Sequence, residues 1–234
     1  VLQGYFDLIG MPYSTSGVLV EALTFDKFVL NNYMRAFGVS VADSLLVKIG
    51  HDKEVSDEDI VSRIGLPCFV KPSRGGSSFG TTKVKTVEAL RPAIELALEE
   101  GEDVMVESFM GGTEITCGCY KTKQKSVVFP ITEVVPQNEF FDYEAKYNGR
   151  SREVCPAQIP DSLRDQIQAA SKKIYAHLGC AGLVRVDYIS SEDGLYFLEV
   201  NTIPGMTAAS LVPQMVRAAG MDMTNFLTAI IENS

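Results

Sequence analysis

The sequence contains only two histidines, His51 and His177, and they lie far apart in the chain. Each stands among polar residues in a helix-like stretch, which is typical of a solvated or capping side chain. A zinc site or a histidine-based catalytic triad needs several partners close together, and two isolated histidines do not supply them. The sequence therefore gives no support to either chemistry.

Cysteine is scarce as well. The five cysteines stand at positions 68, 117, 119, 155 and 180 and form no CxxC pair or disulfide-like spacing. Isolated cysteines of this kind are typical of small buried hydrophobic residues in a reducing compartment. We therefore expect free thiols and a cytoplasmic protein.

Positive charge and long apolar runs are also lacking. The chain has 21 Lys and Arg against 30 Asp and Glu, a formal net charge of −9 and a pI near 4.8. This negative field opposes a phosphate backbone, so no nucleic-acid partner is expected. No apolar stretch approaches the roughly 20 residues that cross a bilayer, and no signal pattern opens the chain, so no membrane partner is expected.

What is present is enough for a sizeable core, in one large domain or two small ones, since 46% of the 234 residues are hydrophobic. Helical patterns cover 18–37, 56–64, 87–100 and 162–178, and two more follow Ser210 and Asp222. Strand-like patterns cover 68–73, 81–86, 103–109, 114–120, 126–135 and a final hairpin. Because hairpins imply antiparallel pairing, we expect an α+β fold rather than a doubly wound parallel sheet.

The final hairpin is the stretch "RVDYISSEDGLYFLEVNTIPGM" (185–206), whose two arms alternate in polarity. Its apolar residues are expected on one face: Val184, Val186, Tyr188, Tyr196, Leu198 and Val200. Its polar residues are expected on the other face: Arg185, Asp187, Glu199 and Asn201. This arrangement requires a turn of three or five residues around "SEDG", because a four-residue turn would not pair Asp187 with Glu199.

Two carboxylates facing each other across a strand pair repel, which a sheet normally avoids. A divalent cation held between them turns the repulsion into attraction, and Mg²⁺ takes oxygen ligands. Asp187, Glu199 and the carbonyl of Asn201 therefore form a candidate metal site. The alternative is that both acids splay into solvent on an outer strand, which the apolar flanking residues disfavour.

A Gly/Ser loop follows Lys71 in "VKPSRGGSSFGTTKV". Glycines let backbone N–H groups approach phosphate oxygens, and Ser77 and Ser78 add hydroxyl donors. The loop is not a Walker motif, because Thr81 stands where the lysine is required and no helix follows. By itself it is compatible with a phosphate-binding loop or with an ordinary turn.

The segment 136–160 has no steady periodicity but carries Phe140, Phe141, Tyr143 and Tyr147 among charged residues. A loop of this length is usually a lid or disordered. Because its aromatic side chains favour packing, we expect a lid.

Ordered motifs along nearly the whole chain resemble the D-alanine–D-alanine ligases of the ATP-grasp superfamily. They include "GMPYSTSGV", "VKPSRGGSSFG", "VESFMGGTEIT", "DYEAKY", "GLVRVDY" and "FLEVNTIPGMT" followed by "SLVP". The resemblance implies an ATP-grasp fold, in which two α/β subdomains with mainly antiparallel sheets sandwich ATP. It places a remnant of the N-terminal substrate domain at 1–24, the central subdomain at 25–107 and the C-terminal subdomain at 108–234, with the lid at about 136–160.

The resemblance also implies roles in nucleotide binding. Lys27, Lys71 and Ser78 resemble the phosphate ligands, and Lys146 in the lid resembles the residue that reaches the γ-phosphate. Glu107 resembles the acceptor for the adenine amino group. The expected remaining contacts are backbone atoms of Phe109 and Met110 to adenine, Glu114 to the ribose, and Asp187, Glu199 and Asn201 to two Mg²⁺ or Mn²⁺ ions.

The reaction implied by the resemblance joins two D-alanine molecules through an acylphosphate, for peptidoglycan precursor synthesis. Positioning and charge neutralisation would supply most of the catalysis. Arg185 and the N–H of Gly205 resemble the donors that stabilise the tetrahedral oxyanion. Ser210 and the N–H of Leu211, at a helix start, resemble the site for the second D-alanine carboxylate. Tyr147 and Ser77 resemble the pair that orders the lid.

Two departures from the family matter. Ile203 stands where relatives often have a different residue, so the detail of the substrate pocket stays open. The chain begins at "VLQGYF", whereas relatives carry a preceding domain with an acidic loop for the first D-alanine, so we expect residues upstream. The open alternatives are an ATP-binding fragment that is inactive without this domain, and another ATP-grasp carboxylate–amine ligase. A homodimer is expected at full length.

Overall fold

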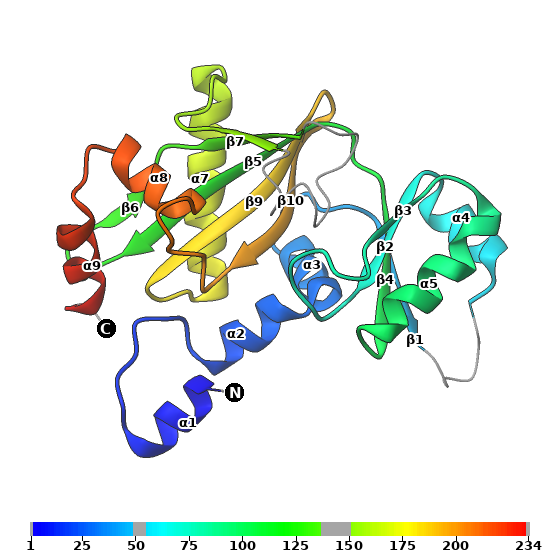
Figure 1. Cartoon of the computed structure of the whole chain (residues 1–234), viewed down its shortest axis with the longest axis horizontal. Helices are drawn as coiled ribbons and strands as arrows, with labels where there is room; N and C mark the ends of the chain where they lie inside the picture. The colour runs from blue at the N-terminus through cyan, green and yellow to red at the C-terminus, as the bar shows by residue number, and fades with distance from the viewer. Residues whose placement is uncertain (1, 49–54, 137–150, 233–234) are drawn as a thin grey trace. The chain divides into compact units, whose positions relative to one another are not determined.

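The computed structural model describes residues 2–48, 55–136 and 151–232, and it has the expected α+β fold with antiparallel sheets (Figure 1). The chain forms two compact units. Unit 1 comprises Val1–Thr24, Gly112–Val135 and Arg152–Ser234, and unit 2 comprises Phe25–Gly111 and Pro136–Ser151. None of the helices in these described ranges is long and apolar enough to cross a membrane.

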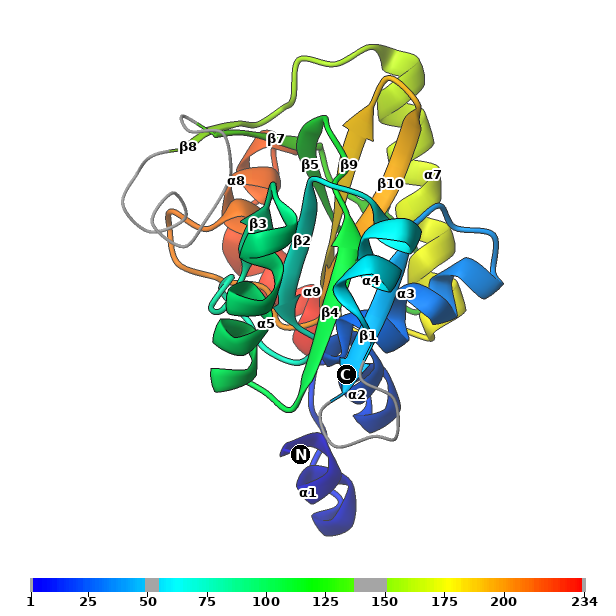
Figure 2. The same ribbon diagram turned by 90° about the vertical axis from the view of Figure 1, so that its right-hand side faces the viewer.

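Unit 2 contains a four-stranded antiparallel sheet with the strand order β1-β4-β2-β3. Helices α4 and α5 lie on one face of this sheet (Figure 2) and bury an apolar core against it. The strands are β1 (Ser44–Lys48), β2 (Cys68–Pro72), β3 (Thr82–Val84) and β4 (Asp103–Ser108). The helices are α3 (Lys27–Ala36), α4 (Asp57–Ile64), a 3₁₀ turn (Val87–Ala89) and α5 (Leu90–Glu99).

Unit 1 contains a six-stranded sheet in which β10, β9, β5, β7 and β8 follow one another and β6 pairs with β5. Helix α7 packs along this sheet, and α8 and α9 pack together. The strands are β5 (Thr113–Lys121), β6 (Ser126–Val128), β7 (Thr132–Pro136), β8 (Ser151–Val154), β9 (Leu183–Ser191) and β10 (Gly194–Asn201). The helices are α1 (Leu2–Ile9), α2 (Val18–Phe25), α7 (Asp161–Leu178), α8 (Leu211–Ala218) and α9 (Met223–Ile231).

The predicted helix ends of α4 are confirmed. Ser56 caps the helix by accepting a hydrogen bond from the N–H of Asp59, and Gly65 follows its last turn with φ 80°. Helix α7 likewise ends at Gly179 in the left-handed conformation. Local capping chemistry therefore sets these boundaries as the sequence predicted.

The prediction of one helix over 18–37 is wrong. The chain forms α2 and α3 with a break at Asp26, whose backbone is extended (φ −95°, ψ 103°). The predicted strand 126–135 is also divided, into β6 and β7 on either side of residues 129–131. In both places the apolar pattern continues through the break, so periodicity alone does not reveal it.

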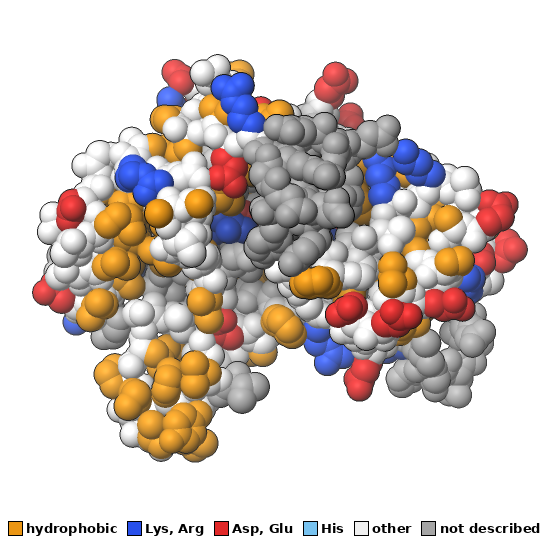
Figure 3. Space-filling view, in the orientation of Figure 1, with side chains coloured by type: hydrophobic (Ala, Val, Ile, Leu, Met, Phe, Trp, Pro, Cys, Tyr) orange, Lys and Arg blue, Asp and Glu red, His pale blue; other side chains and the backbone are white. Residues whose placement is uncertain are grey.

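Helix α1 was not predicted, although its apolar residues are spaced as on one helix. Figure 3 shows apolar side chains gathered over α1. The exposed ones in and just after this helix are Leu2, Tyr5, Leu8, Ile9 and Met11.

The five cysteines are free thiols, as expected. Cys68 in unit 2 and Cys117 and Cys119 in unit 1 are buried, and the other two are partly buried. Burial raises the pKa of Cys117 to about 12. A thiol with so high a pKa holds its proton at neutral pH and is a poor nucleophile.

Candidate functional site

The β9–β10 hairpin pairs Asp187 with Glu199 and Arg185 with Asn201, which confirms the predicted register. The turn, however, has two residues, Glu192 and Asp193, rather than three or five. A β-bulge between Phe197 and Glu199 compensates, because the extra residue, Leu198, shifts the following pairs by one position.

The bulge changes which apolar residues share a face. Phe197 pairs with Tyr188 and is buried, and Val200 pairs with Val186 and is also buried. The expectation that Tyr196 and Leu198 lie on this face with Val200 is therefore wrong. The expected polar face is unaffected, because Glu199 and Asn201 follow the bulge and pair with Asp187 and Arg185 as predicted.

The polar residues of this face form a connected cluster around Asp187, which is almost completely buried. Arg185 donates from Nε and Nη2 to the two carboxylate oxygens of Asp187, each at 2.8 Å. Thr116 on β5 donates to Oδ1 of Asp187, and Asn201 Nδ2 donates to its Oδ2 at 2.9 Å. Both oxygens of the buried carboxylate thus have charged or polar donors.

Arg185 stays protonated in this environment. Burial by itself would lower its pKa, but the charges of Asp187, Glu199 and Glu114 outweigh the burial and raise the pKa above its usual value. A permanently charged guanidinium can bind a carboxylate or a developing oxyanion. The cluster therefore provides a fixed positive charge beside two acids.

The same cluster brings together the three side chains that the sequence predicted as magnesium ligands. Nδ2 of Asn201 lies 2.9 Å from an oxygen of Asp187 and 3.3 Å from an oxygen of Glu199, so both carboxylates converge on one point. Across the described ranges, no three His, Cys, Asp or Glu side chains gather as a metal site. The oxygen donors here are two carboxylates and one amide, a set that suits Mg²⁺.

In unit 2, Lys71 on β2 and Glu107 on β4 form a buried ion pair with Nζ and Oε1 2.5 Å apart. The side chains are only 11% and 4% exposed, so little water screens their charges. Oε2 of Glu107 is buried and has no hydrogen-bond partner among the described residues. A buried carboxylate oxygen in this state is suited to accept a donor from a ligand.

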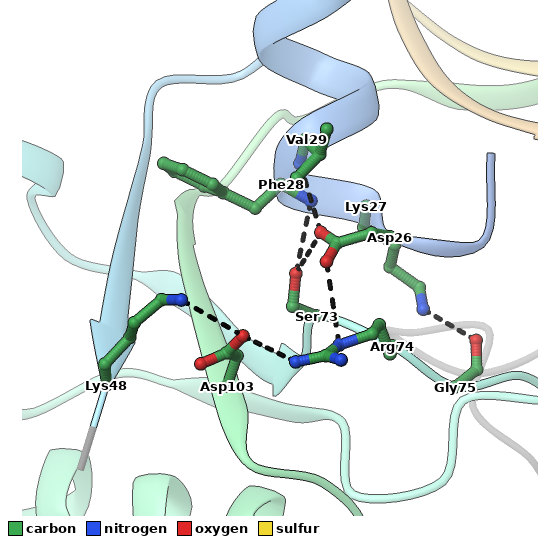
Figure 4. A network of polar contacts seen from close by, with 9 residues as sticks. All are labelled: Asp26, Lys27, Phe28, Val29, Lys48, Ser73, Arg74, Gly75 and Asp103. Atoms are coloured by element: carbon green, nitrogen blue, oxygen red, sulfur yellow. Dashed lines mark hydrogen bonds and ion pairs between the residues drawn. The ribbon is translucent and has the colours of Figure 1, made fainter. Parts of the chain in front are cut away.

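Lys27, the first residue of α3, also lies beside the Gly/Ser loop. Its Nζ donates to the carbonyl of Gly75 at 2.8 Å (Figure 4). Further along the loop, Ser77 and Ser78 have positive φ angles of 54° and 60°, which are uncommon for residues other than glycine. Backbone strain of this kind is concentrated at functional loops.

Phe109 follows β4 and is about one-third exposed. Its ring lies against Phe69, and Nζ of Lys83 lies 3.8 Å from its centre. The N–H of Phe109 donates to the carbonyl of Pro67, which fixes the backbone just after Glu107. The expected adenine contacts at Phe109 and Met110 thus lie on the same segment as Glu107.

Gly205 and Ser210 face each other before α8 in unit 1. A Cβ atom at Gly205 would lie 2.9 Å from Oγ of Ser210, so a larger residue would displace this hydroxyl. Ser210 Oγ accepts the N–H of Thr207 at 3.1 Å and lies 2.8 Å from its hydroxyl. Its side chain does not cap α8, and Leu211 is the first residue of that helix.

Some predicted residues lie outside the part of the chain that the structure describes. They are Lys146 and Tyr147, the other lid aromatics and His51.

Two residues of the site were not predicted from the sequence, Thr116 and Asp26. Thr116 is found only once β5 is known to neighbour β9, whereas the sequence "DKFV" carries a helix-cap signal at Asp26.

Comparison with known proteins shows which family the chain resembles. A family model described as "D-ala D-ala ligase C-terminus" matches residues 33–232. A D-alanine–D-alanine ligase of Bacteroides fragilis is 60% identical over 233 residues, which is 99% of this chain and 71% of that protein.

Solved structures agree with these matches. The VanG D-Ala:D-Ser ligase from Enterococcus faecalis has a TM-score of 0.90 and 36% identity, covering 99% of this chain and 68% of that one. The D-alanine–D-alanine ligase from Bacillus anthracis complexed with ATP has a TM-score of 0.83 and 30% identity, covering 100% of this chain and 73% of that one.

Proposed function

The chain belongs to the D-alanine–D-alanine ligase family, and from this premise we propose that it joins two D-alanine molecules with ATP, for peptidoglycan precursor synthesis. The observation that carries the proposal is the 60% identity to a ligase of this name along 99% of the chain. ATP as the energy source is supported by the similar ligase that was solved in complex with it.

Unit 2 holds the residues proposed for the nucleotide. Lys27 and Lys71 would neutralise the phosphates, and Ser78 would donate to them from the strained loop. Glu107 would accept the adenine amino group, with backbone atoms of Phe109 and Met110 beside it. The buried Oε2 of Glu107 supports this role, because no residue in the described parts of the chain donates to it.

Unit 1 holds the residues proposed for the metal and the acyl group. Asp187, Glu199 and Asn201 would hold two Mg²⁺ or Mn²⁺ ions, and Glu114 would contact the ribose. Bound Mg²⁺ neutralises phosphate charge and polarises the γ-phosphate. Asn201 now presents its amide nitrogen to the two acids, so metal binding would require its side chain to turn the amide oxygen toward the ion.

The chemistry proceeds in two substitutions. A carboxylate oxygen of the first D-alanine attacks the γ-phosphorus, and the bond from that phosphorus to the bridging oxygen breaks, which releases ADP. The amine of the second D-alanine then attacks the acyl carbon, loses a proton and displaces phosphate. Arg185 and the N–H of Gly205 would donate to the tetrahedral oxyanion, a kind of interaction in which the loss of one donor costs about 3–4 kcal/mol of transition-state stabilisation.

The acceptor D-alanine is proposed to bind through its carboxylate to Ser210 and the N–H of Leu211. Backbone N–H groups at a helix start favour an anion, and the Thr207 contacts hold the Ser210 hydroxyl in place. Tyr147, Ser77 and Lys146 are proposed to act when the lid closes. A tyrosine at 147 favours an amine acceptor over a hydroxy acid, as the resemblance implied.

Several expectations stay predictions. They concern the subdomain boundaries at 24–25 and 107–108, the homodimer, the effect of Ile203 and a cytoplasmic location.

The test is to supply the protein with ATP, MgCl₂ and D-alanine and to measure both phosphate release and dipeptide. We expect one phosphate per D-alanyl-D-alanine, and no phosphate when D-alanine is left out. D-Serine offered in competition should compete poorly as acceptor. ATP binding without dipeptide formation would favour the alternative of an ATP-binding protein without ligase activity.

A further inference from the structure

Asp26 interrupts what would otherwise be a continuous helix, and its side chain shows why. The residue is the N-cap of α3, and its Oδ1 accepts the N–H of Val29 at 3.1 Å (Figure 4). A cap alone requires only this bond. Asp26, however, also contacts a segment far along the chain, beginning with Ser73, which lies 47 residues further on.

Ser73 is the first of these contacts, and it is completely buried at the base of the Gly/Ser loop. Its hydroxyl donates to Oδ1 of Asp26 at 2.7 Å and accepts the N–H of Phe28 at 3.4 Å. Its carbonyl accepts the N–H of Lys27 at 2.8 Å. Three consecutive residues at the start of α3 are thus bound to one serine.

Arg74 extends the network on the other side. Its guanidinium lies 3.6 Å from Oδ2 of Asp26 and donates to Asp103 at 2.7 Å, while Lys48 lies 3.5 Å from the same Asp103 oxygen. The backbones of Asp26 and Arg74 also form an isolated antiparallel bridge. The loop base is therefore fixed to both α3 and the neighbouring strands.

Lys27 is placed by this arrangement. As the first helical residue it directly follows Asp26, and its Nζ already reaches the carbonyl of Gly75. If Asp26 released Ser73, the start of α3 and the base of the loop would keep their backbone contacts but lose the side-chain bond that fixes them to each other. Both would then be more mobile, and ATP would have to order them when it binds.

We propose that Asp26 is a positioning residue for the phosphates of ATP, which acts by joining Lys27 and the base of the 73–80 loop into one rigid element. This inference rests on the proposed function, because it deepens the role of the same site. It assigns no direct contact between Asp26 and the nucleotide. Ser73 is the residue through which Asp26 acts.

The test measures the Kd values of ATP and of adenosine for Asp26→Ala and Ser73→Ala by titration calorimetry. ATP binding should weaken about tenfold, which corresponds to ordering one or two more side chains on binding. Adenosine binding should change less than about twofold, since its proposed contacts at Glu107 and Phe109 are untouched. This difference separates positioning from general loosening of the unit.

The matched control is Asp222→Ala. Asp222 caps α9 through the N–H of Asn225 at 2.9 Å, as Asp26 caps α3, so its loss should cost similar stability without weakening ATP binding. Asp26→Asn should restore binding to within about twofold, because an amide oxygen still accepts from Val29 and Ser73. If Asp26→Ala does not fold, Asp26→Asn and Ser73→Ala are compared instead.

Two outcomes would overturn the inference. One is an equal loss of ATP and adenosine affinity in Asp26→Ala, and the other is unchanged ATP affinity in both alanine variants. Failure of the unaltered protein to bind ATP would instead contradict the proposed function and, with it, this inference.

Discussion

Glu199 lies directly opposite Asp187 in the antiparallel ladder of β9 and β10. Because the guanidinium of Arg185 offsets the repulsion within this pair, Glu199→Gln should change the stability of the metal-free protein by less than about 1 kcal/mol. The Tm in chelator should therefore shift by no more than about 4 °C. Added MgCl₂ should raise the Tm of the unaltered protein but not of the variant, and turnover should fall sharply.

The control for this change is Glu95→Gln, which removes an exposed acid from α5. It should alter neither the metal response nor turnover. A normal metal response in Glu199→Gln would remove Glu199 from the proposed site.

Arg185→Met should be strongly destabilising, because it leaves the carboxylate of Asp187 buried beside Glu199 without its ionic partner. The expected loss is about 3–5 kcal/mol, measured as a lower urea midpoint. Thr116→Val removes one neutral donor from the same carboxylate and should cost only about 1 kcal/mol. Equal losses in the two variants would show that the charge of Arg185 matters little.

Lys71→Met should lower stability and ATP affinity together, because it leaves the buried Glu107 without its ionic partner and removes a proposed phosphate ligand. A stability loss of about 3–5 kcal/mol is expected. Loss of a charged hydrogen bond should weaken ATP binding about 10- to 100-fold. Adding Glu107→Gln should recover most of the stability, as followed by urea unfolding, but not ATP binding. Recovery of both would mean that Lys71 has only a structural role.

Glu21 should make stability fall as the pH rises. Burial raises its pKa above the ordinary 4.5, although a hydrogen bond from Thr202 opposes the shift. Below pH 4.5 the carboxyl is protonated in both the folded and unfolded states. Between 4.5 and its higher folded pKa, the unfolded chain releases the proton first, so ionisation favours unfolding.

Glu21→Gln should therefore be more stable than the unaltered protein at neutral pH, and the difference should vanish in acid. Thermal unfolding across this pH range measures it. Glu88→Gln is the control of opposite sign, because hydrogen bonds from its own backbone N–H and from Thr86 lower the pKa of Glu88. If stability depended on pH in the same way in both variants, the raised pKa of Glu21 would be contradicted.

The polar face of the hairpin could be predicted because alternation constrains both arms over several residues. The turn length and the bulge could not be predicted. The two-residue turn shifts the pairing in one direction and the bulge at Leu198 shifts it back, so Asp187 still faces Glu199 and the spacing of the acids is the same as with a longer turn. The burial of Phe197 distinguishes the two-residue turn with a bulge from a longer turn without one. The sequence does not distinguish them, because positions 196, 197 and 198 are all apolar.

Contacts between distant segments account for the other differences. The break at Asp26 depends on Ser73, and the pairing of Lys71 with Glu107 depends on β2 lying beside β4. From the sequence, Lys71 was expected at the phosphates of ATP and Glu107 at its adenine, and their contact with each other was not predicted. In the folded chain they form an ion pair through Oε1 of Glu107, which explains how both charges are tolerated in a buried position.

The buried thiols make it possible to measure local unfolding of each unit by chemical labelling. A thiol reagent can attack Cys68 only when unit 2 opens, and Cys117 or Cys119 only when unit 1 opens. Peptide mass analysis of partly alkylated protein would thus resolve two opening rates in one sample. A ligand held by one unit should slow the labelling of that unit's cysteines first, so the order of protection would reveal which half of the chain receives each substrate.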